Sequence, residues 1–164
     1  MKISIINTII TMIFISLLLL YSCSIETYTT RKNAADQAVL KYIYDNGLHV
    51  EADSLGFAFI NMIEGEGDCP REGDKVAFHY KGYFFDGEIF DTSYGKPYPL
   101  IVELGDGMLI KGLEESLKLM SKGSKAKVVV PFYLAYDDLD NAPVPPYSNL
   151  IFEIELIDFT SVKK

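Results

Sequence analysis

The segment GEIFDTS, residues 87–93, places a carboxylate, Asp91, directly after two large apolar side chains, Ile89 and Phe90. A charge beside buried rings destabilises a fold by several kcal/mol unless another group pairs with it. Two chemical uses of a carboxylate in such a place are general acid–base catalysis and metal coordination. The sequence supports neither use well, so the role of Asp91 has to be found from the elements around it.

Other reactive side chains lack the partners that catalysis or metal binding needs. Cys69 stands in a polar, turn-like segment, GDCPREGD, with no base beside it, which predicts an incidental surface thiol. His79 has no paired ligand and is predicted to be structural or exposed. The segment DDLDN, with Asp137, Asp138 and Asp140, lacks the glycine and final glutamate of an EF-hand loop and predicts a solvated loop. We therefore expect no metal and no cofactor.

Composition and charge predict one globular domain that does not bind nucleic acid. The 164 residues are 49% hydrophobic and 23% charged, which is typical of a folded domain with a core. Lys2 is the only charged residue among the first 22, so the remainder carries 14 basic and 23 acidic residues, a net charge of −9. An acidic surface repels phosphates, and the sequence has neither a P-loop nor a GxGxxG motif.

The N-terminus indicates export and attachment to a membrane. Residues 1–22 hold one charge, Lys2, and then an apolar run that ends at Leu20, which is typical of a signal peptide. The letters LYSC resemble a bacterial lipobox, in which the signal is removed and the cysteine, here Cys23, is lipidated. An uncleaved anchor is the alternative, because about 20 apolar residues can span a bilayer. In both cases the domain is tethered at the cell envelope, facing the periplasm or the exterior.

A short extension precedes the main domain. Residues 23–33 are polar and predict a tether, and residues 34–56 predict a helical extension. We expect this extension to dock on the main domain, residues 57–164, and the alternative is the stub of a dimerisation arm. The helix itself should cover residues 34–47 and end at Gly47. Its apolar side chains recur at helical spacing. They are Val39, Leu40, Ile43 and Tyr44.

Alternating apolar and polar side chains predict the strands of the main domain. The clearest strand is LIFEIELIDF, in which Glu153 and Glu155 point away from the apolar side. KVAFHYKGYF alternates in the same way, and PLIVEL and AKVVVPF are two further strands. An antiparallel sheet is therefore expected.

One helix, LEESLKLM, interrupts these strands. Its Leu113, Leu117 and Met120 line a single apolar stripe, while Glu114 and Lys118 should form an exposed pair. A twisted antiparallel sheet with one short helix on one face is an α+β fold. The long segment FYLAYDDLDNAPVPPYSN contains aromatic residues and three prolines, which predicts a shaped loop.

Four segments stand in order along the main domain. They are FHYKGYFFDGEIFDTS, GDGMLIKGLEESLKLMSKGSKAKVVVP, AY with the following PVPP, and NLIFEIELIDF. Together they resemble the successive signatures of FKBP-type peptidyl-prolyl cis-trans isomerases, from about residue 64 to residue 159. The resemblance implies a twisted antiparallel half-barrel sheet wrapped around one short helix, with a hydrophobic pocket between them that accepts a proline ring.

Carried over position by position, the resemblance implies site residues of two kinds. The expected catalytic residues are Tyr80, Phe90, Asp91, Ile110, Tyr136 and Phe152. The expected substrate-binding residues are Leu100, Leu109, Leu113 and Val144. The Ile110 N–H and the Tyr136 hydroxyl would hold substrate carbonyls. Asp91 would accept a hydrogen bond from Tyr80 and so orient the pocket wall.

The resemblance implies an enzyme that rotates X–Pro peptide bonds of exported proteins. Its partners would be proline-containing segments of envelope proteins and, through Cys23, the membrane, and the chain is expected to be a monomer. Two departures leave other functions open, because Leu113 stands where the family commonly has tryptophan and Asp137 where it often has glycine. The alternatives are a chaperone-like module that binds proline segments with little turnover, and an envelope lipoprotein with a vestigial pocket.

The lipid anchor can be tested at Cys23. The change Cys23→Ala removes the thiol that would carry the acyl group. We therefore expect an unprocessed or differently cleaved chain with an unchanged fold over residues 57–159. Mass spectrometry of membrane-extracted protein measures the N-terminus. A parent protein that keeps Met1 and an unmodified Cys23 would contradict the lipid anchor.

Overall fold

The computed structural model describes residues 12–13, 27–140 and 142–161. Cys23 and nearly all of residues 1–22 lie outside the described residues, so the signal peptide and the lipid anchor stay predictions. Within the described part of the chain, no helix is both long enough and apolar enough to cross a membrane.

The chain divides into two compact units, Met1–Ala34 and Ala35–Lys164. In the first unit, residues 27–34 are helical. The second unit contains the sheet, its covering helices and the pocket that is described below.

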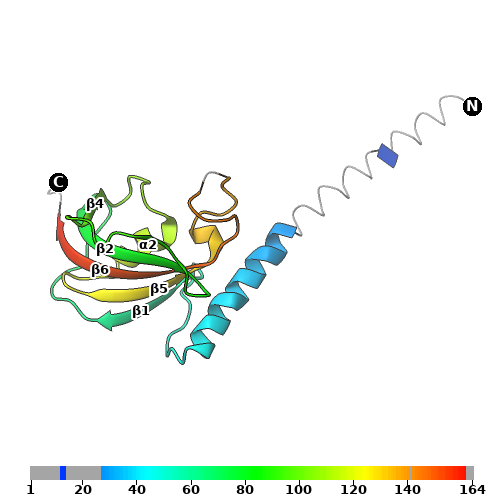
Figure 1. The fold of residues 1–164 in the computed structure, drawn as a ribbon, viewed down its shortest axis with the longest axis horizontal. Helices are drawn as coiled ribbons and strands as arrows, with labels where there is room; N and C mark the ends of the chain where they lie inside the picture. The colour runs from blue at the N-terminus through cyan, green and yellow to red at the C-terminus, as the bar shows by residue number, and fades with distance from the viewer. Residues whose placement is uncertain (1–11, 14–26, 141, 162–164) are drawn as a thin grey trace, which may run out of the picture. The chain divides into compact units, whose positions relative to one another are not determined.

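Six strands form one antiparallel sheet in the second unit (Figure 1). They pair in the order β1-β5-β6-β2-β3, and β4 pairs with β2 beside this path. The apolar side chains that alternate along β6 are all buried, as the sequence pattern predicts, and they are Leu150, Phe152, Ile154 and Leu156. The strand bounds are β1 Ala58–Ile63, β2 Lys75–Phe84, β3 Ile89–Thr92, β4 Leu100–Glu103, β5 Lys125–Val130 and β6 Leu150–Thr160.

The helix α2 (Lys111–Leu117) packs on one face of the sheet (Figure 1). Its Leu113 and Leu117 are buried in the main core, and so is Met120, just beyond its end. Gly112 permits the close approach, because a Cβ atom there would lie 2.4 Å from Cγ1 of Val130. A single helical turn, η1 (Phe132–Leu134), follows β5. The predicted α+β fold, an antiparallel sheet wrapped around one short helix, is confirmed.

The prediction that Glu114 and Lys118 form an exposed pair is wrong about exposure. The two side chains do pair, at 3.7 Å between Oε1 and Nζ, but Glu114 is only 9% exposed. Lys118 also lies 3.3 Å from Glu115 and 3.7 Å from Glu72. The segment that carries Glu72 comes from a distant part of the sequence, so helical periodicity could not reveal that it approaches this side of α2.

The N-terminal helix covers residues 27–45 and begins earlier than the predicted start at residue 34. Residues 27–33, which we predicted to belong to a short polar tether, are helical. Neither glycine nor proline, the two strongest helix breakers, occurs between residues 27 and 45. A polar composition alone therefore did not indicate a loop here.

Only part of the predicted apolar face of this helix is buried. Val39 and Ile43 are buried together with Ala35, one turn earlier. Leu40 and Tyr44, predicted on the same face, are 46% and 85% exposed, so this part of the prediction is wrong. Helical spacing alone does not say whether Leu40 and Tyr44 are buried with Val39 and Ile43. The contact with the sheet covers only the line of Ala35, Val39 and Ile43.

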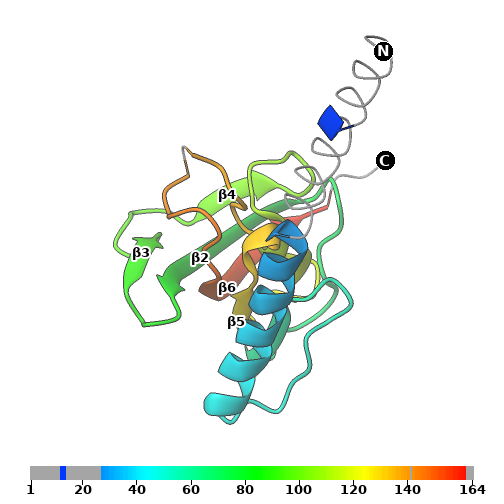
Figure 2. The same cartoon turned by 90° about the vertical axis from the view of Figure 1, so that its right-hand side faces the viewer.

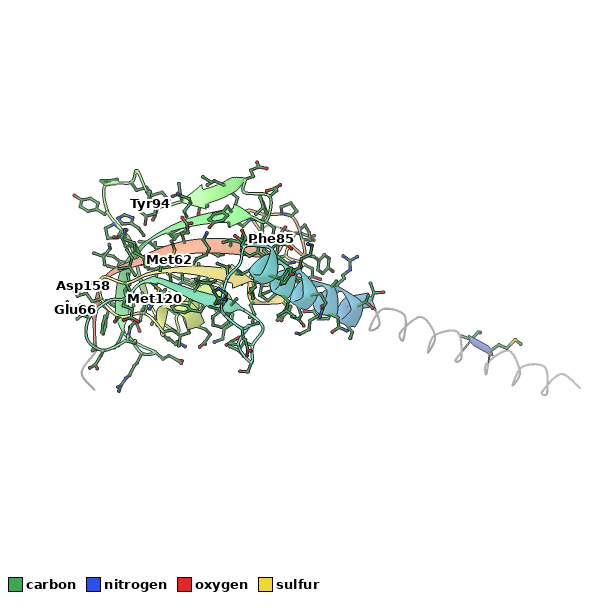
Figure 3. The ribbon with its side chains drawn as sticks, turned by 90° about the horizontal axis from the view of Figure 1, so that it is seen from below. Met62, Glu66, Phe85, Tyr94, Met120 and Asp158 are labelled. Atoms are coloured by element: carbon green, nitrogen blue, oxygen red, sulfur yellow. The ribbon has the colours of Figure 1, made fainter. Side chains whose placement is uncertain are left out.

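The predicted docking of the extension on the main domain is confirmed for residues 35–45, which cover the second face of the sheet (Figure 2). Their buried side chains pack with Ala58, Val129 and Ile151 in a second core cluster. Phe85, labelled in Figure 3, lies beside the helix with its ring centroid 5.1 Å from that of Tyr42. The sheet therefore packs apolar side chains on both faces, against α2 on one and against residues 35–45 on the other.

A pair of substitutions on adjacent helix faces tests this docking. Ile43→Ala leaves a cavity in the second core cluster and should lower the free energy of unfolding by about 2–4 kcal/mol. The matched change Leu40→Ala, on the exposed side, should cost less than about 0.5 kcal/mol. Urea denaturation of each variant measures both values. Equal losses for the two variants would contradict the docked arrangement.

Candidate active site

A pocket of about 130 Å³ lies between the sheet and the segment that leads into α2. It brings together nine of the ten predicted site residues, which come from strands β2, β3, β4 and β6, from residues 109–113 and from the loop after β5. The nine are Tyr80, Phe90, Asp91, Leu100, Leu109, Ile110, Leu113, Tyr136 and Phe152.

Val144, the tenth predicted residue, does not line the pocket. Its side chain is 5% exposed and packs in the main core. Two lining residues were missed, Phe78 and Met108. Phe78 lies two residues before Tyr80 on the same strand face, so the period-two pattern could have found it. Met108 precedes Leu109 in a loop, where no periodicity points to the pocket.

Phe90 and Phe152 form the aromatic wall of the pocket. Their rings meet edge to face, with centroids 5.8 Å apart, and Phe84 supports Phe90 from a centroid distance of 5.3 Å. This packing requires a glycine at position 82, because a Cβ atom there would lie 2.6 Å from Cζ of Phe90 and 2.9 Å from Cε1 of Phe152. Leu113 lines the same pocket and is almost fully buried.

Asp91 pairs with the polar groups of its own wall. The Tyr80 hydroxyl donates to Oδ2 of Asp91 at 2.5 Å, and the backbone N–H of Thr92 donates to Oδ1 at 2.8 Å. Burial, reinforced by the hydrogen bond to Asp91 and by its charge, raises the pKa of Tyr80 well above its ordinary value of 10.0. The carboxylate therefore holds a neutral phenol in one orientation at the pocket.

Two hydrogen-bonding groups of the pocket have no partner among the described residues. They are the Tyr136 hydroxyl and the backbone N–H of Ile110. Ile110 is extended, with φ −64° and ψ 149°, and its carbonyl accepts from the N–H groups of Leu113 and Glu114 at the start of α2. Burial, with the charge of Asp91 as a second cause, raises the pKa of Tyr136.

Asp137 explains one of the departures from the family pattern. Its backbone has φ of +52°, in the left-handed region that glycine adopts most easily. Aspartate is one of the few other residues that tolerate this region. The structure therefore keeps, at Asp137, a backbone conformation that suits glycine.

The remaining reactive side chains lie away from the pocket. His79 Nδ1 is 3.0 Å from Oγ of Ser93, and its ring stacks on Tyr94 at a centroid distance of 5.1 Å. Cys69 is a partly buried free thiol. Among the described residues, no three or more His, Cys, Asp or Glu side chains are grouped as metal ligands.

The antiparallel sheet, the short helix against it and the aromatic pocket between them define an FKBP-like domain. The model of the family described as FKBP-type peptidyl-prolyl cis-trans isomerase matches residues 67–157. The chain belongs to this family of enzymes.

Three comparisons give the degree of similarity. The FKBP-type peptidyl-prolyl cis-trans isomerase FkpA of Escherichia coli (strain K12) is 39% identical over 115 residues, 70% of this chain and 42% of FkpA. FK506-binding protein 2 of Debaryomyces hansenii is 37% identical over 94 residues, 57% of this chain and 70% of that protein. The crystal structure of FkpA from Escherichia coli matches with a TM-score of 0.69 and 34% identity, covering 84% of this chain and 63% of that one. The matched sequence is less than half of FkpA.

The packing at Gly82 can be tested by one methyl group. In Gly82→Ala the new Cβ must push the rings of Phe90 and Phe152 apart, so we expect a loss of about 1–3 kcal/mol in stability and a changed near-ultraviolet circular dichroism spectrum. Combining it with Phe90→Leu, which removes the clashing ring atoms, should recover part of the stability. A Gly82→Ala variant with the parental spectrum and unfolding midpoint would refute this packing.

Proposed function

We propose that this chain catalyses the cis–trans isomerisation of X–Pro peptide bonds in proteins exported to the cell envelope. One observation carries the proposal. The aromatic pocket holds two hydrogen-bonding groups, the Tyr136 hydroxyl and the Ile110 N–H, that no described residue uses. Both residues are half-buried, and a bound peptide would cover these groups, so they suit its carbonyl oxygens as partners.

The reaction requires no nucleophile and no proton transfer to carbon or nitrogen. Rotation about the X–Pro bond is opposed by amide resonance, with a barrier of roughly 18–20 kcal/mol. The twisted amide has lost resonance and has a less polar carbonyl, so an apolar pocket binds it better than the planar, well-hydrated amide. Preferential binding of the twisted state lowers the barrier.

Each lining group then has a role. Phe90 and Phe152 hold the proline ring from the sides, and Leu113 closes the floor. The Ile110 N–H and the Tyr136 hydroxyl hold substrate carbonyls on either side of the rotating bond.

The remaining groups act on substrate through shape and orientation. Tyr80 is fixed by Asp91, whose role in this proposal is orientation. Leu100 and Leu109 contact the substrate chain. Val144 is buried in the main core and has no contact with substrate in this proposal.

A second function is favoured by the pocket floor. Leu113 is smaller than the tryptophan common in this family and gives a non-aromatic floor. A module that binds proline segments with little turnover would have the same wall and the same carbonyl-binding groups. The third possible function is that of an envelope lipoprotein with a vestigial pocket. Measuring the isomerisation rate of the parent protein distinguishes an active isomerase from both of these alternatives.

We also propose that the chain is a monomeric lipoprotein. The support is the apolar run of residues 1–22, the lipobox-like LYSC and the polar residues that follow it. In this proposal residues 1–22 are removed, Cys23 carries the lipid, residues 23–56 connect and cover the sheet, and residues 57–164 form the isomerase domain. Its substrates are proline-containing segments of envelope proteins.

Two substitutions test the enzyme, measured with a protease-coupled assay on a proline tetrapeptide. Phe90→Ala removes a wall and should raise the activation free energy by about 1–3 kcal/mol, which lowers kcat/KM roughly 5- to 160-fold. Asp91→Asn leaves a single acceptor oxygen for two donors, so an orienting role predicts a drop of about 10-fold. Ile89→Ala, on an exposed neighbour outside the pocket, is the matched control and should keep the parental rate.

The pH profile decides whether Asp91 orients or transfers a proton. The pKa values of Tyr80 and Tyr136 are raised above 10.0, so both phenols stay protonated at lower pH. Activity should therefore be nearly flat from about pH 6 to pH 9. A bell-shaped profile, or complete loss in Asp91→Asn, would indicate acid–base catalysis. Parental rates in folded Phe90→Ala and Asp91→Ala variants would show that the active site lies elsewhere.

A further inference from the structure

A hydrogen bond joins the N-terminal helix to the active-site loop. The hydroxyl of Tyr133, in η1, donates to Oδ1 of Asp36 on the helix, and it also lies 3.4 Å from the carbonyl oxygen of Leu55. Gly56 leaves the space for this hydroxyl, since a Cβ atom there would lie 2.1 Å from it. Residues 36, 55 and 56 all precede the segment, residues 67–157, that matches the family.

Tyr133 stands three residues before Tyr136 in a turn with defined hydrogen bonds. The carbonyl of Phe132 accepts from the N–H groups of Ala135 and Asp137, both at 2.9 Å, so the amides on either side of Tyr136 share one acceptor. Phe132 is itself buried, and its N–H donates to Oδ1 of Asn149 at 3.0 Å. The position of the Tyr136 backbone therefore follows that of residues 132 and 133.

The hydrogen bond is not what docks the helix. Docking comes from the apolar contacts of Val39 and Ile43 in the second core cluster, on the outer face of the sheet. Asp36 lies one turn before Val39 and accepts a hydrogen bond from Tyr133 in η1, which is not part of that cluster. A hydrogen bond with a carboxylate is shorter and stronger than a neutral one, so it can hold a loop in place.

We propose that Asp36 and Tyr133 are positioning residues, through which the N-terminal helix holds the Tyr136 hydroxyl in place at the pocket. The inference rests on the proposed function, in which Tyr136 binds a substrate carbonyl. It assigns the helical extension a part in the active site, in addition to covering the sheet. Asp36 and Tyr133 themselves do not line the pocket.

Removal of a single oxygen atom tests the inference. Tyr133→Phe should lower kcat/KM on a proline tetrapeptide by about 3- to 10-fold, as expected for a slightly misplaced binding group. Hydrogen exchange at the amides of Ala135 and Asp137, measured by NMR, should become faster. Asp36→Ala should have the same two effects, whereas Asp36→Asn, which keeps an acceptor oxygen, should restore most of the activity.

A second tyrosine provides the matched control. The Tyr83 hydroxyl donates to Oε1 of Glu153 at 3.0 Å, and Tyr83 packs against the same second core cluster. Tyr83→Phe is therefore the same chemical change near the helix, but without a link to the turn at residues 132–137. It should leave kcat/KM and the exchange of Ala135 and Asp137 at parental values.

A double variant separates a positioning role from a general loss of stability. If Tyr133 acts through Tyr136, then Tyr133→Phe should lower activity very little in a Tyr136→Phe background, because interacting residues are non-additive. Additive effects, or an effect of Tyr133→Phe no larger than that of Tyr83→Phe, would overturn the inference. If Tyr133→Phe does not fold, the Asp36→Ala and Asp36→Asn pair decides by the same criteria.

The proposed function and this inference fail in different ways. A parent protein without isomerase activity overturns the proposed function. Faster exchange at Ala135 and Asp137, confined to the Asp36 and Tyr133 variants, would then still support the link between helix and loop. An active parent with unchanged exchange and unchanged kcat/KM in those variants overturns the inference alone.

Discussion

The close contact between Gly112 and Val130 determines how near α2 can come to the sheet. A helix of seven residues is too short to be stable alone, so it depends on burying Leu113 and Leu117 in the main core. A Cβ atom at residue 112 would meet Val130 at 2.4 Å and push the helix outward. Because Ile110 and Leu113 flank this contact, it also determines the floor of the pocket and the place of the Ile110 N–H group.

The pocket combines apolar walls with few polar groups, and those groups are held by one another or left open to a ligand. Asp91 is exposed at the rim of the pocket and accepts from the Tyr80 hydroxyl and from the Thr92 backbone N–H, so its carboxylate orients the wall while staying in contact with solvent. The Tyr136 hydroxyl and the Ile110 N–H stay available among the described residues. Such a site suits binding of a strained peptide bond better than acid–base chemistry.

The two faces of the sheet pack against different elements. One face packs on α2 and forms the pocket, while the other packs on residues 35–45 through Val129 and Ile151. The helix and the pocket loop are joined by the hydrogen bond between Asp36 and Tyr133. An element outside the family-matched segment is thereby connected to the loop that carries Tyr136.

Local sequence determined four of the six strands, the stripe of Leu113 and Leu117 and, through family resemblance, nine of the eleven pocket residues. Period-two alternation reports burial on one face directly, so β6 could be predicted. Tertiary structure alone decided that Ile151 is buried on the other face, that Glu114 is covered, that Val144 packs in the core and that Leu40 and Tyr44 are exposed. The reason is physical: periodicity states which side chains share a face, but burial depends on a partner from a distant part of the chain.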